Sequence, residues 1–327
     1  MQRQLSARHD RFALNRPFRI ARGVKTAADV ITVTVSEGGV TGRGEGVPYP
    51  RYGESVETAL AAVERVRPMI EEGGGRDALI EALEPGAARN AVDCALWDLE
   101  ARRLGRSIAD LIGAPAPERL ASALTIVIDT PDAMARAASQ VASAPLLKVK
   151  VDAEAPEAQL RAVRTAAPNS ALIVDPNESW NPALLEAIQA VLAQARVGLL
   201  EQPLSAGEDG WLEGFKPAVP ICADESVHVA ADLETVARRY QAVNVKLDKA
   251  GGLTAALALA HAARARGLGL MTGCMVSSSL AIAPALHVAR MSDWVDCDGP
   301  VWLSEDRPGG IREESGFLHP PVEGFWG

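Results

Sequence analysis

The sequence is poor in residues that mark several common kinds of site. Its 327 residues include only four cysteines and five histidines. The cysteines form no CxxC pair, and the histidines form no HxH or HExxH pattern. We therefore expect reduced thiols, and zinc catalysis is disfavoured. The four cysteines are Cys94, Cys222, Cys274 and Cys297.

Long apolar runs and basic runs are also lacking. Nowhere do about 18 consecutive apolar residues stand without a charge, and the N-terminal stretch has no apolar segment of signal-peptide length. No run of Lys or Arg could form a phosphate-binding stripe, and the net charge is −9. We expect a soluble cytoplasmic protein with no nucleic-acid or membrane partner. With 48% hydrophobic residues, the chain can bury a large core.

A repeating pattern begins at about residue 119. A short apolar strand candidate is followed by a polar break and then by an Ala-rich stretch with helical spacing. The eight strand candidates are ALTIVI, LLKVKV, ALIVD, VGLLE, VPICAD, AVNVKLD, LGLMTG and WVDCDG. Eight such units in one run predict a (β/α)8-type barrel rather than an open sheet, because no Gly-rich phosphate turn follows the first strand.

The first 115 residues follow another pattern. Residues 28–48 alternate around a Gly-Gly pair and predict an antiparallel hairpin, and residues 88–105 have helical spacing and end at a glycine. We expect an α+β capping domain at residues 1–115 and a catalytic barrel at residues 116–302. Residues 303–327 lack the barrel pattern and are expected to return to the cap.

Three carboxylates follow consecutive apolar strands: Asp175, Glu201 and Asp224. The carboxyl ends of barrel strands meet in one small volume, where desolvated charges are costly unless they are paired or bind a metal. With no His or Cys nearby, this trio suits a hard cation, and Mg²⁺ fits better than Zn²⁺ or Ca²⁺.

Lysines flank this trio. Lys150 lies two strands before the strand of Glu201 and Lys246 two strands after it, so we expect them to face each other across the barrel. This arrangement fits two-base proton transfer at the carbon next to a metal-bound carboxylate. Lys148 shares a strand face with Lys150 and, with the metal, is expected to lower the pKa of that base toward neutrality.

These residues resemble the enolase superfamily. The matching motifs are KVK, DPN, LLEQPL, ADES and VKLDKAGGLT, in that order along the chain, together with the helix ARNAVDCALWDLEARR. The resemblance implies a modified TIM-type (β/α)7β barrel with an α+β capping domain, and Mg²⁺ with lysine bases that stabilise an enediolate. Pro176 departs from the usual Asp-Ala-Asn on the third strand, but ligation by Asp175 is expected to survive.

The resemblance also implies a substrate. Lys-x-Lys with a lysine on the sixth strand is similar to the muconate-lactonizing subgroup, and DCDGP is similar to the Asp-x-Asp motif with which dipeptide epimerases bind a free α-amino group. FRIARG, VPYPRYGES and LMTGCM resemble L-Ala-D/L-Glu epimerases of murein peptide recycling. The implied substrate contacts are Arg22, for the glutamate carboxylate, and Thr125, Lys148, Cys274, Val276, Asp296 and Asp298.

Two other functions stay open. A cycloisomerase, an o-succinylbenzoate synthase or an N-acylamino acid racemase of the same subgroup would act on a substrate without a free ammonium group, so Asp298 would be dispensable. A non-catalytic barrel that binds small ligands through a structural metal is a remote alternative. The sequence does not decide whether the chain forms a homo-oligomer.

Overall fold

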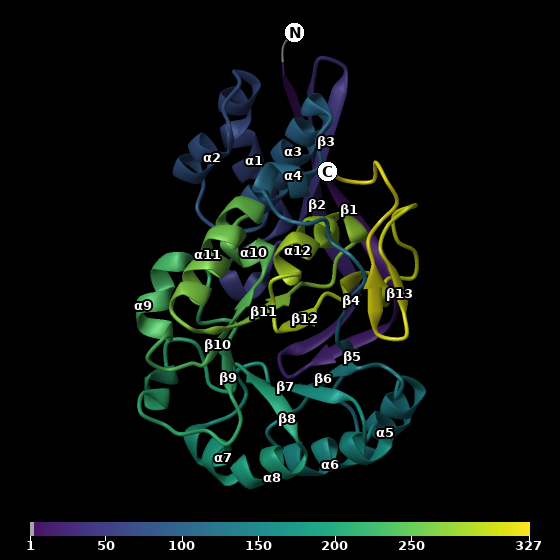
Figure 1. The fold of residues 1–327 in the computed structure, drawn as a ribbon, viewed down its shortest axis with the longest axis vertical. Coiled ribbons are helices and arrows are strands. Elements are labelled where there is room, and N and C mark those ends of the chain that lie inside the picture. Colours follow the sequence, from purple (N-terminus) through teal and green to yellow (C-terminus); the bar gives the residue numbers. More distant parts are fainter. Residues whose placement is uncertain (1–2) are drawn as a thin grey trace.

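The computed structural model describes residues 3–327, and its centre is a closed parallel barrel (Figure 1). Its eight strands pair in chain order from the first to the last. The backbone N–H of Ala123 donates to the carbonyl of Val295 at 2.8 Å and joins the first strand to the last. The predicted barrel is confirmed, with strands β5(Leu124–Ile126), β6(Leu146–Lys150), β7(Ala171–Asp175), β8(Val197–Glu201), β9(Ile221–Ala223), β10(Ala242–Val245), β11(Gly269–Gly273) and β12(Trp294–Asp296).

The eight strands have seven connections, of which six contain an α-helix, so the architecture is of the (β/α)7β type. Several begin with proline in the first turn, where its missing N–H costs no hydrogen bond. Between β8 and β9 only a 3₁₀ turn is present, a departure from the regular pattern. The connecting helices are α5(Pro131–Gln140), α6(Pro156–Ala166), α7(Pro182–Ala187), α8(Gln189–Gln194), η2(Asp209–Leu212), η3(Ala230–Asp232), α9(Leu233–Val236), α10(Leu247–Ala250), α11(Leu253–Ala265) and α12(Ser279–Ala289).

A three-stranded antiparallel sheet and four helices precede the barrel. The predicted hairpin is confirmed, and its turn is Gly38–Gly39, both with positive φ. Figure 1 shows that the long β1–β2 hairpin reaches from these elements down to the barrel strands. The elements are β1(Gln4–Ile20), β2(Gly23–Glu37), β3(Val40–Gly46), η1(Pro50–Tyr52), α1(Val56–Glu71), α2(Arg76–Ala82), α3(Ala87–Leu104) and α4(Ile108–Ile112). Helix α3 lies within one residue of its prediction at each end.

Alternate glycines on β3 allow α3 to lie directly on the sheet. Gly42, Gly44 and Gly46 share one strand face, and a Cβ on any of them would stand 2.1–2.2 Å from a carbonyl oxygen of α3. Backbone atoms of a buried helix cannot move aside independently, so only glycine fits there.

The substitution Gly44→Ala is expected to lower the free energy of unfolding by about 2–3 kcal/mol, because the added methyl group would meet the carbonyl oxygen of Ala91. Urea denaturation measures this change. Gly75→Ala is the control, since a Cβ at Gly75 meets nothing within 4 Å; because Gly75 is the N-cap of α2 and alanine caps less well, its expected loss is about 1 kcal/mol or less. Equal losses in the two variants would contradict this account of the helix–sheet contact.

The C-terminal residues contact both parts of the chain. Strand β14(Phe317–His319) pairs with β13(Arg312–Glu314) and with β4(Leu120–Ala121), next to the first barrel strand, and η4(Gly299–Trp302) follows β12. Arg307 forms ion pairs with Asp10 and Glu45 of the N-terminal sheet. These contacts support our proposed division into a cap at 1–115, a barrel at 116–302 and a returning segment at 303–327; residues 1–2 lie outside the described part.

Within residues 3–327, none of the helices has the length and apolar character needed to cross a bilayer.

Candidate active site

Charged side chains form the layer above an apolar layer inside the barrel. Seven residues of the apolar layer pack together, including Leu146, Ile173, Leu199, Cys222 and Met271. Side chains two residues further along a strand point the same way and therefore lie one layer higher, toward the carboxyl ends. These higher positions hold Lys148, Asp175, Glu201 and Asp224. On β6 the intervening Leu147 and Val149 pack outward in the main core, as the alternation predicted.

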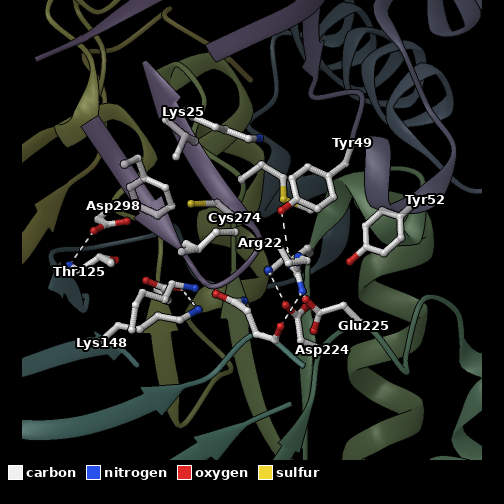
Figure 2. Close-up of a pocket in the computed structure, with 18 residues that line it drawn as sticks. Arg22, Lys25, Tyr49, Tyr52, Thr125, Lys148, Asp224, Glu225, Cys274 and Asp298 are labelled. Carbon is white, nitrogen blue, oxygen red and sulfur yellow. Dashed lines mark hydrogen bonds and ion pairs between the residues drawn. The ribbon is translucent and has the colours of Figure 1, made fainter. Parts of the chain in front are cut away.

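A pocket lies above this layer, between the barrel mouth and the cap (Figure 2). It is the place where most of the predicted site residues meet. Those that line it are Arg22, Thr125, Lys148, Lys150, Asp224, Lys246, Cys274, Val276, Asp296 and Asp298. The other two, Asp175 and Glu201, are buried below its surface and contact the lysines that line it.

Lys148 links the carboxylates beneath the pocket. Its Nζ lies 2.6 Å from Glu201 Oε2, 2.7 Å from Asp296 Oδ2 and 3.2 Å from Asp175 Oδ2. Burial disfavours its charge, but these carboxylates outweigh burial and raise the pKa of Lys148 well above its usual value. Lys148 therefore stays an ammonium group.

The three carboxylates differ in pKa. For Asp175, Lys150 and Lys148 outweigh the effect of burial and lower the pKa to about 2. For Asp224, Lys246 and Lys249 outweigh burial and hold the pKa well below the usual value. For Glu201, burial together with the charge of Asp175 raises the pKa to about 7. A further positive charge near Glu201 would favour its ionised form.

The donor set fits a hard cation. Three carboxylates from adjacent strands supply only oxygen atoms, the donors that Mg²⁺ prefers, and Glu201 Oε2 is buried with the Lys148 ammonium group 2.6 Å away. Residues 3–327 contain no preassembled cluster of three or more potential ligands. In this structure Asp175 and Glu201 instead converge on the ammonium group of Lys148. The ligand role of Asp175, Glu201 and Asp224 stays a prediction.

The two predicted bases come from well-separated strands and line the same pocket. Lys150 Nζ lies 2.5 Å from Asp175 Oδ2, and Lys246 Nζ lies 2.7 Å from Asp224 Oδ2. Burial and the charge of Lys148 both lower the pKa of Lys246, but Asp224 and Glu201 raise it further, so the net shift is well upward.

One end of the pocket is acidic. Asp298 Oδ2 accepts hydrogen bonds from the backbone N–H of Thr125 at 2.9 Å and from Trp302 Nε1 at 3.1 Å. Burial and the charge of Asp296 raise the pKa of Asp298 to about 6. Asp296 Oδ1 is buried and has no hydrogen-bond partner among residues 3–327. This pair of carboxylates is suited to an ammonium group.

The opposite end carries Arg22, from the β1–β2 hairpin, and is closed by ion pairs. The guanidinium lies 2.7 Å from Glu225 Oε1 and 3.0 Å from Glu178 Oε2. Glu178 also binds Arg51 through both of its carboxylate oxygens, at 2.8 Å each. Arg22 is therefore already paired with two carboxylates, so a substrate carboxylate would have to share or displace them.

Sequence reasoning missed several residues of this end. Lys25, Tyr49 and Tyr52 line the pocket (Figure 2). Lys25 Nζ stands 4.5 Å from the centroid of the Tyr49 ring, and no ion pair joins Lys25 to a carboxylate of residues 3–327. Burial lowers the pKa of Lys25. Its place three residues after Arg22, on the same hairpin, was the signal that could have identified it.

Pro176 leaves the end of β7 intact. Asp175 remains the last residue of the strand, and its Oδ1 accepts from the backbone N–H of Asn177 at 2.8 Å. Asn177 and Glu178 then adopt positive φ, 48° and 67°. This tight turn brings Glu178 to Arg22, so the departure from the family pattern does not remove Asp175 from the site.

Comparisons with known proteins agree with the fold and cover most of the chain. Residues 2–113 match the model of the mandelate racemase / muconate lactonizing enzyme N-terminal domain, and residues 132–323 match the enolase C-terminal domain-like model. The L-Ala-D/L-Glu epimerase of Escherichia coli K12 is 49% identical over 308 residues, which are 94% of this chain and 96% of that protein.

Two solved structures are similar over almost their whole length. An enolase family member from Agrobacterium tumefaciens, with bound sodium and L-Ala-L-Glu, has a TM-score of 0.97 and 46% identity, covering 99% of this chain and 100% of that one. A dipeptide epimerase from Methylococcus capsulatus, complexed with Mg and L-Arg-D-Lys, has a TM-score of 0.88 and 31% identity, covering 98% and 97%. The chain belongs to the mandelate racemase / muconate lactonizing enzyme family of the enolase superfamily.

Proposed function

We propose that this protein is a Mg²⁺-dependent dipeptide epimerase that inverts the Cα of the C-terminal residue of L-Ala-D/L-Glu. The observation that carries the proposal is the distribution of charge along the pocket. Asp298 lies on one side of the pocket and Arg22 on the other (Figure 2), and Asp296, Lys25, Lys150 and Lys246 also line it. A dipeptide with a free amino group and an acidic C-terminal residue has the complementary order of charges.

The lysines would move the proton. Lys150 and Lys246 are proposed to stand on opposite faces of the substrate Cα, one removing the α-proton and the other returning a proton to the opposite face. Asp175 and Asp224 lie 2.5 and 2.7 Å from the two lysine nitrogens and position them. Lys148 would add positive charge beside the substrate carboxylate.

The carboxylates of Asp175, Glu201 and Asp224 would hold Mg²⁺. When bound, Mg²⁺ supplies a positive charge that stabilises the negative charge developing on the substrate carboxylate. The oxygen-only donor set supports this assignment, as does the Mg in the related Methylococcus structure.

The acidic end distinguishes this function from the other reactions of the subgroup. An acylated amino acid or a cyclohexadiene acid has no ammonium group to place between Asp296 and Asp298, and burying those carboxylates against an uncharged acyl group would be unfavourable. N-acylamino acid racemisation, o-succinylbenzoate synthesis and cycloisomerisation are therefore less compatible with this pocket, and the lysine pair argues against a non-catalytic barrel.

Exchange of the α-proton tests the proposal. In D₂O with Mg²⁺, the protein is expected to replace the α-proton of the glutamyl residue of L-Ala-L-Glu by deuterium and to form L-Ala-D-Glu, followed by ¹H NMR and chiral chromatography. N-acetyl-L-Ala-L-Glu, which lacks the ammonium group, and L-Ala-L-Leu, which lacks the acidic side chain, should each exchange at least about tenfold more slowly. Faster exchange with the acetylated peptide than with the free dipeptide would refute the assignment.

Other parts of the assignment stay predictions. All four cysteines are free thiols, which supports a reducing, cytoplasmic location. Participation in murein peptide recycling follows only if L-Ala-D/L-Glu is the substrate, and a homo-oligomer is a separate prediction that sedimentation or light scattering would test.

A further inference from the structure

Gln202 directly follows Glu201 at the carboxyl end of β8, and both residues are fully buried. It lies below the pocket and does not line it. We propose that Gln202 is a positioning residue that sets the relative placement of Asp175, Glu201 and Asp224, and thereby the affinity of their site for Mg²⁺. The inference rests on the metal assignment of the proposed function and does not depend on the identity of the dipeptide.

The backbone of Gln202 joins the three strand ends that carry the carboxylates. Its N–H donates at 2.9 Å to the carbonyl of Cys222, which lies on β9 just before Asp224. Its carbonyl accepts from the N–H of Glu178, in the turn after Asp175, at 2.9 Å. To make both bonds Gln202 adopts φ 34°, a left-handed conformation that is unfavourable for a residue with a Cβ. The surrounding contacts must hold it there.

The side-chain amide of Gln202 supplies much of this constraint. Its Oε1 accepts from the backbone N–H of Asp224 at 2.8 Å and from that of Ser226 at 3.2 Å. The end of β9 is thus tied directly to the residue that follows Glu201. A change in the direction of the amide would move the backbone from which the Asp224 carboxylate projects.

The other end of the amide is held by a buried network. Gln202 Nε2 is 2.9 Å from three acceptors, the carbonyl of Leu204, Ser226 Oγ and the Tyr240 hydroxyl. Tyr240 and Ser226 in turn donate to Asp209 Oδ2, at 2.5 and 2.6 Å. Two backbone donors on one side and three acceptors on the other leave the amide a single orientation.

These contacts distinguish Gln202 from an ordinary buried glutamine. Polar groups beyond the ligands of a metal site orient the ligands, and their loss commonly weakens metal binding 10- to 100-fold. Because Gln202 contacts the segments after all three predicted ligand strands, its side chain should affect Mg²⁺ binding more than its contribution to folding alone would explain.

The test is the affinity of the metal-free full-length protein for Mg²⁺, measured by isothermal titration calorimetry without substrate. Gln202→Met keeps the length of the side chain and removes its polar atoms. We expect its Kd for Mg²⁺ to rise about 10- to 100-fold. Thermal melting in EDTA shows separately whether the variant is folded.

Gln241→Met is the matched control. Gln241 Oε1 also accepts a backbone N–H of β9, that of Ile221 at 3.0 Å, but at the amino end of the strand and away from the carboxylates. Its Kd for Mg²⁺ should stay within about twofold of the unaltered protein. An equal rise in the two variants would overturn the inference, as would an unchanged Kd in folded Gln202→Met.

Tyr240→Phe decides the question if Gln202→Met does not fold. It removes one partner of the amide and leaves the bonds of Oε1 in place, so a smaller rise in Kd, about threefold, is expected. An unchanged Kd in folded Tyr240→Phe would then count against the inference. If the unaltered protein bound no Mg²⁺, the metal assignment and this inference would both fall, whereas Mg²⁺ binding without exchange of any dipeptide would overturn only the assigned reaction.

Discussion

Replacement of either Lys150 or Lys246 by alanine is expected to lower epimerisation of L-Ala-L-Glu by at least about 10³-fold. Inversion requires a proton to leave one face of Cα and another to arrive on the opposite face, and general acid–base catalysis by one positioned group contributes about 10²- to 10⁴-fold. In the proposed arrangement each lysine serves one face, because β6 and β10 lie on either side of the three strands that carry the carboxylates.

The two variants should differ in the stereoisomer that they still recognise. A protein that keeps one lysine can remove the α-proton facing it and return a deuteron to the same face, so it exchanges one isomer without inverting it. We expect Lys150→Ala and Lys246→Ala to retain exchange with opposite isomers of the glutamyl residue. ¹H NMR in D₂O on L-Ala-L-Glu and L-Ala-D-Glu measures both rates.

Lys216→Ala is the control for this experiment, because Lys216 is exposed and lies outside the pocket; its rates should equal those of the unaltered protein. Exchange of the same isomer by both active-site variants would contradict the two-base arrangement. So would undiminished inversion in either variant, because one lysine would then suffice.

The substitution Asp224→Asn is expected to abolish activity and also to destabilise the fold. Asp224 pairs with two buried ammonium groups, Lys246 at 2.7 Å and Lys249 at 2.6 Å. Removing one partner of a buried ion pair leaves a desolvated charge, which typically costs about 3–5 kcal/mol. Urea denaturation in EDTA measures this loss apart from any effect of a bound metal.

The pH dependence of this loss of stability follows from the lowered pKa of Asp224. Lys246 and Lys249 outweigh burial and hold the pKa of Asp224 below the ordinary value of 3.8, so folding favours its ionised form. The stabilisation is therefore fully present above about pH 4 and is lost as the pH falls further. The difference in free energy of unfolding between Asp224→Asn and the unaltered protein should narrow as the pH falls below about pH 4.

Asp293→Asn provides the comparison. Asp293 forms a surface ion pair with Arg264 at 2.7 Å, and the two side chains are 44% and 39% exposed. Its loss should cost less than about 1 kcal/mol. A cost for Asp224→Asn no larger than that of Asp293→Asn would show that the buried lysines tolerate the loss of their partner.

Much of the architecture could be predicted because it depends on local periodicity. All eight barrel strands coincide with apolar runs in the sequence, and the cap hairpin turns at the Gly-Gly pair. Strand alternation also placed Lys148 and Lys150 on the face opposite Leu147. Such patterns need only neighbouring residues, since side chains two positions apart share a strand face whatever lies beyond.

The polar partners could not be predicted in the same way. Glu178 lies 156 residues from Arg22, yet the two form an ion pair. Lys25 reaches the pocket because the β1–β2 hairpin extends over the barrel mouth (Figure 1). Gln202 lies directly after β8, and Tyr240 lies in the connection between β9 and β10. The folded barrel brings these two segments into contact. None of these pairs has a spacing that a local pattern specifies.

By itself, the sequence determined the barrel strands, the cap hairpin and the acids and lysines at the strand ends, because hydrophobic alternation and chain order are local properties. The tertiary structure alone decided which carboxylate each ammonium group contacts, that Arg22 is held by Glu178 and Glu225, and that Asp224 and Glu201 raise the pKa of Lys246. The physical reason is that electrostatic energies depend on distance and burial. Both are established only when the barrel closes and the cap covers it.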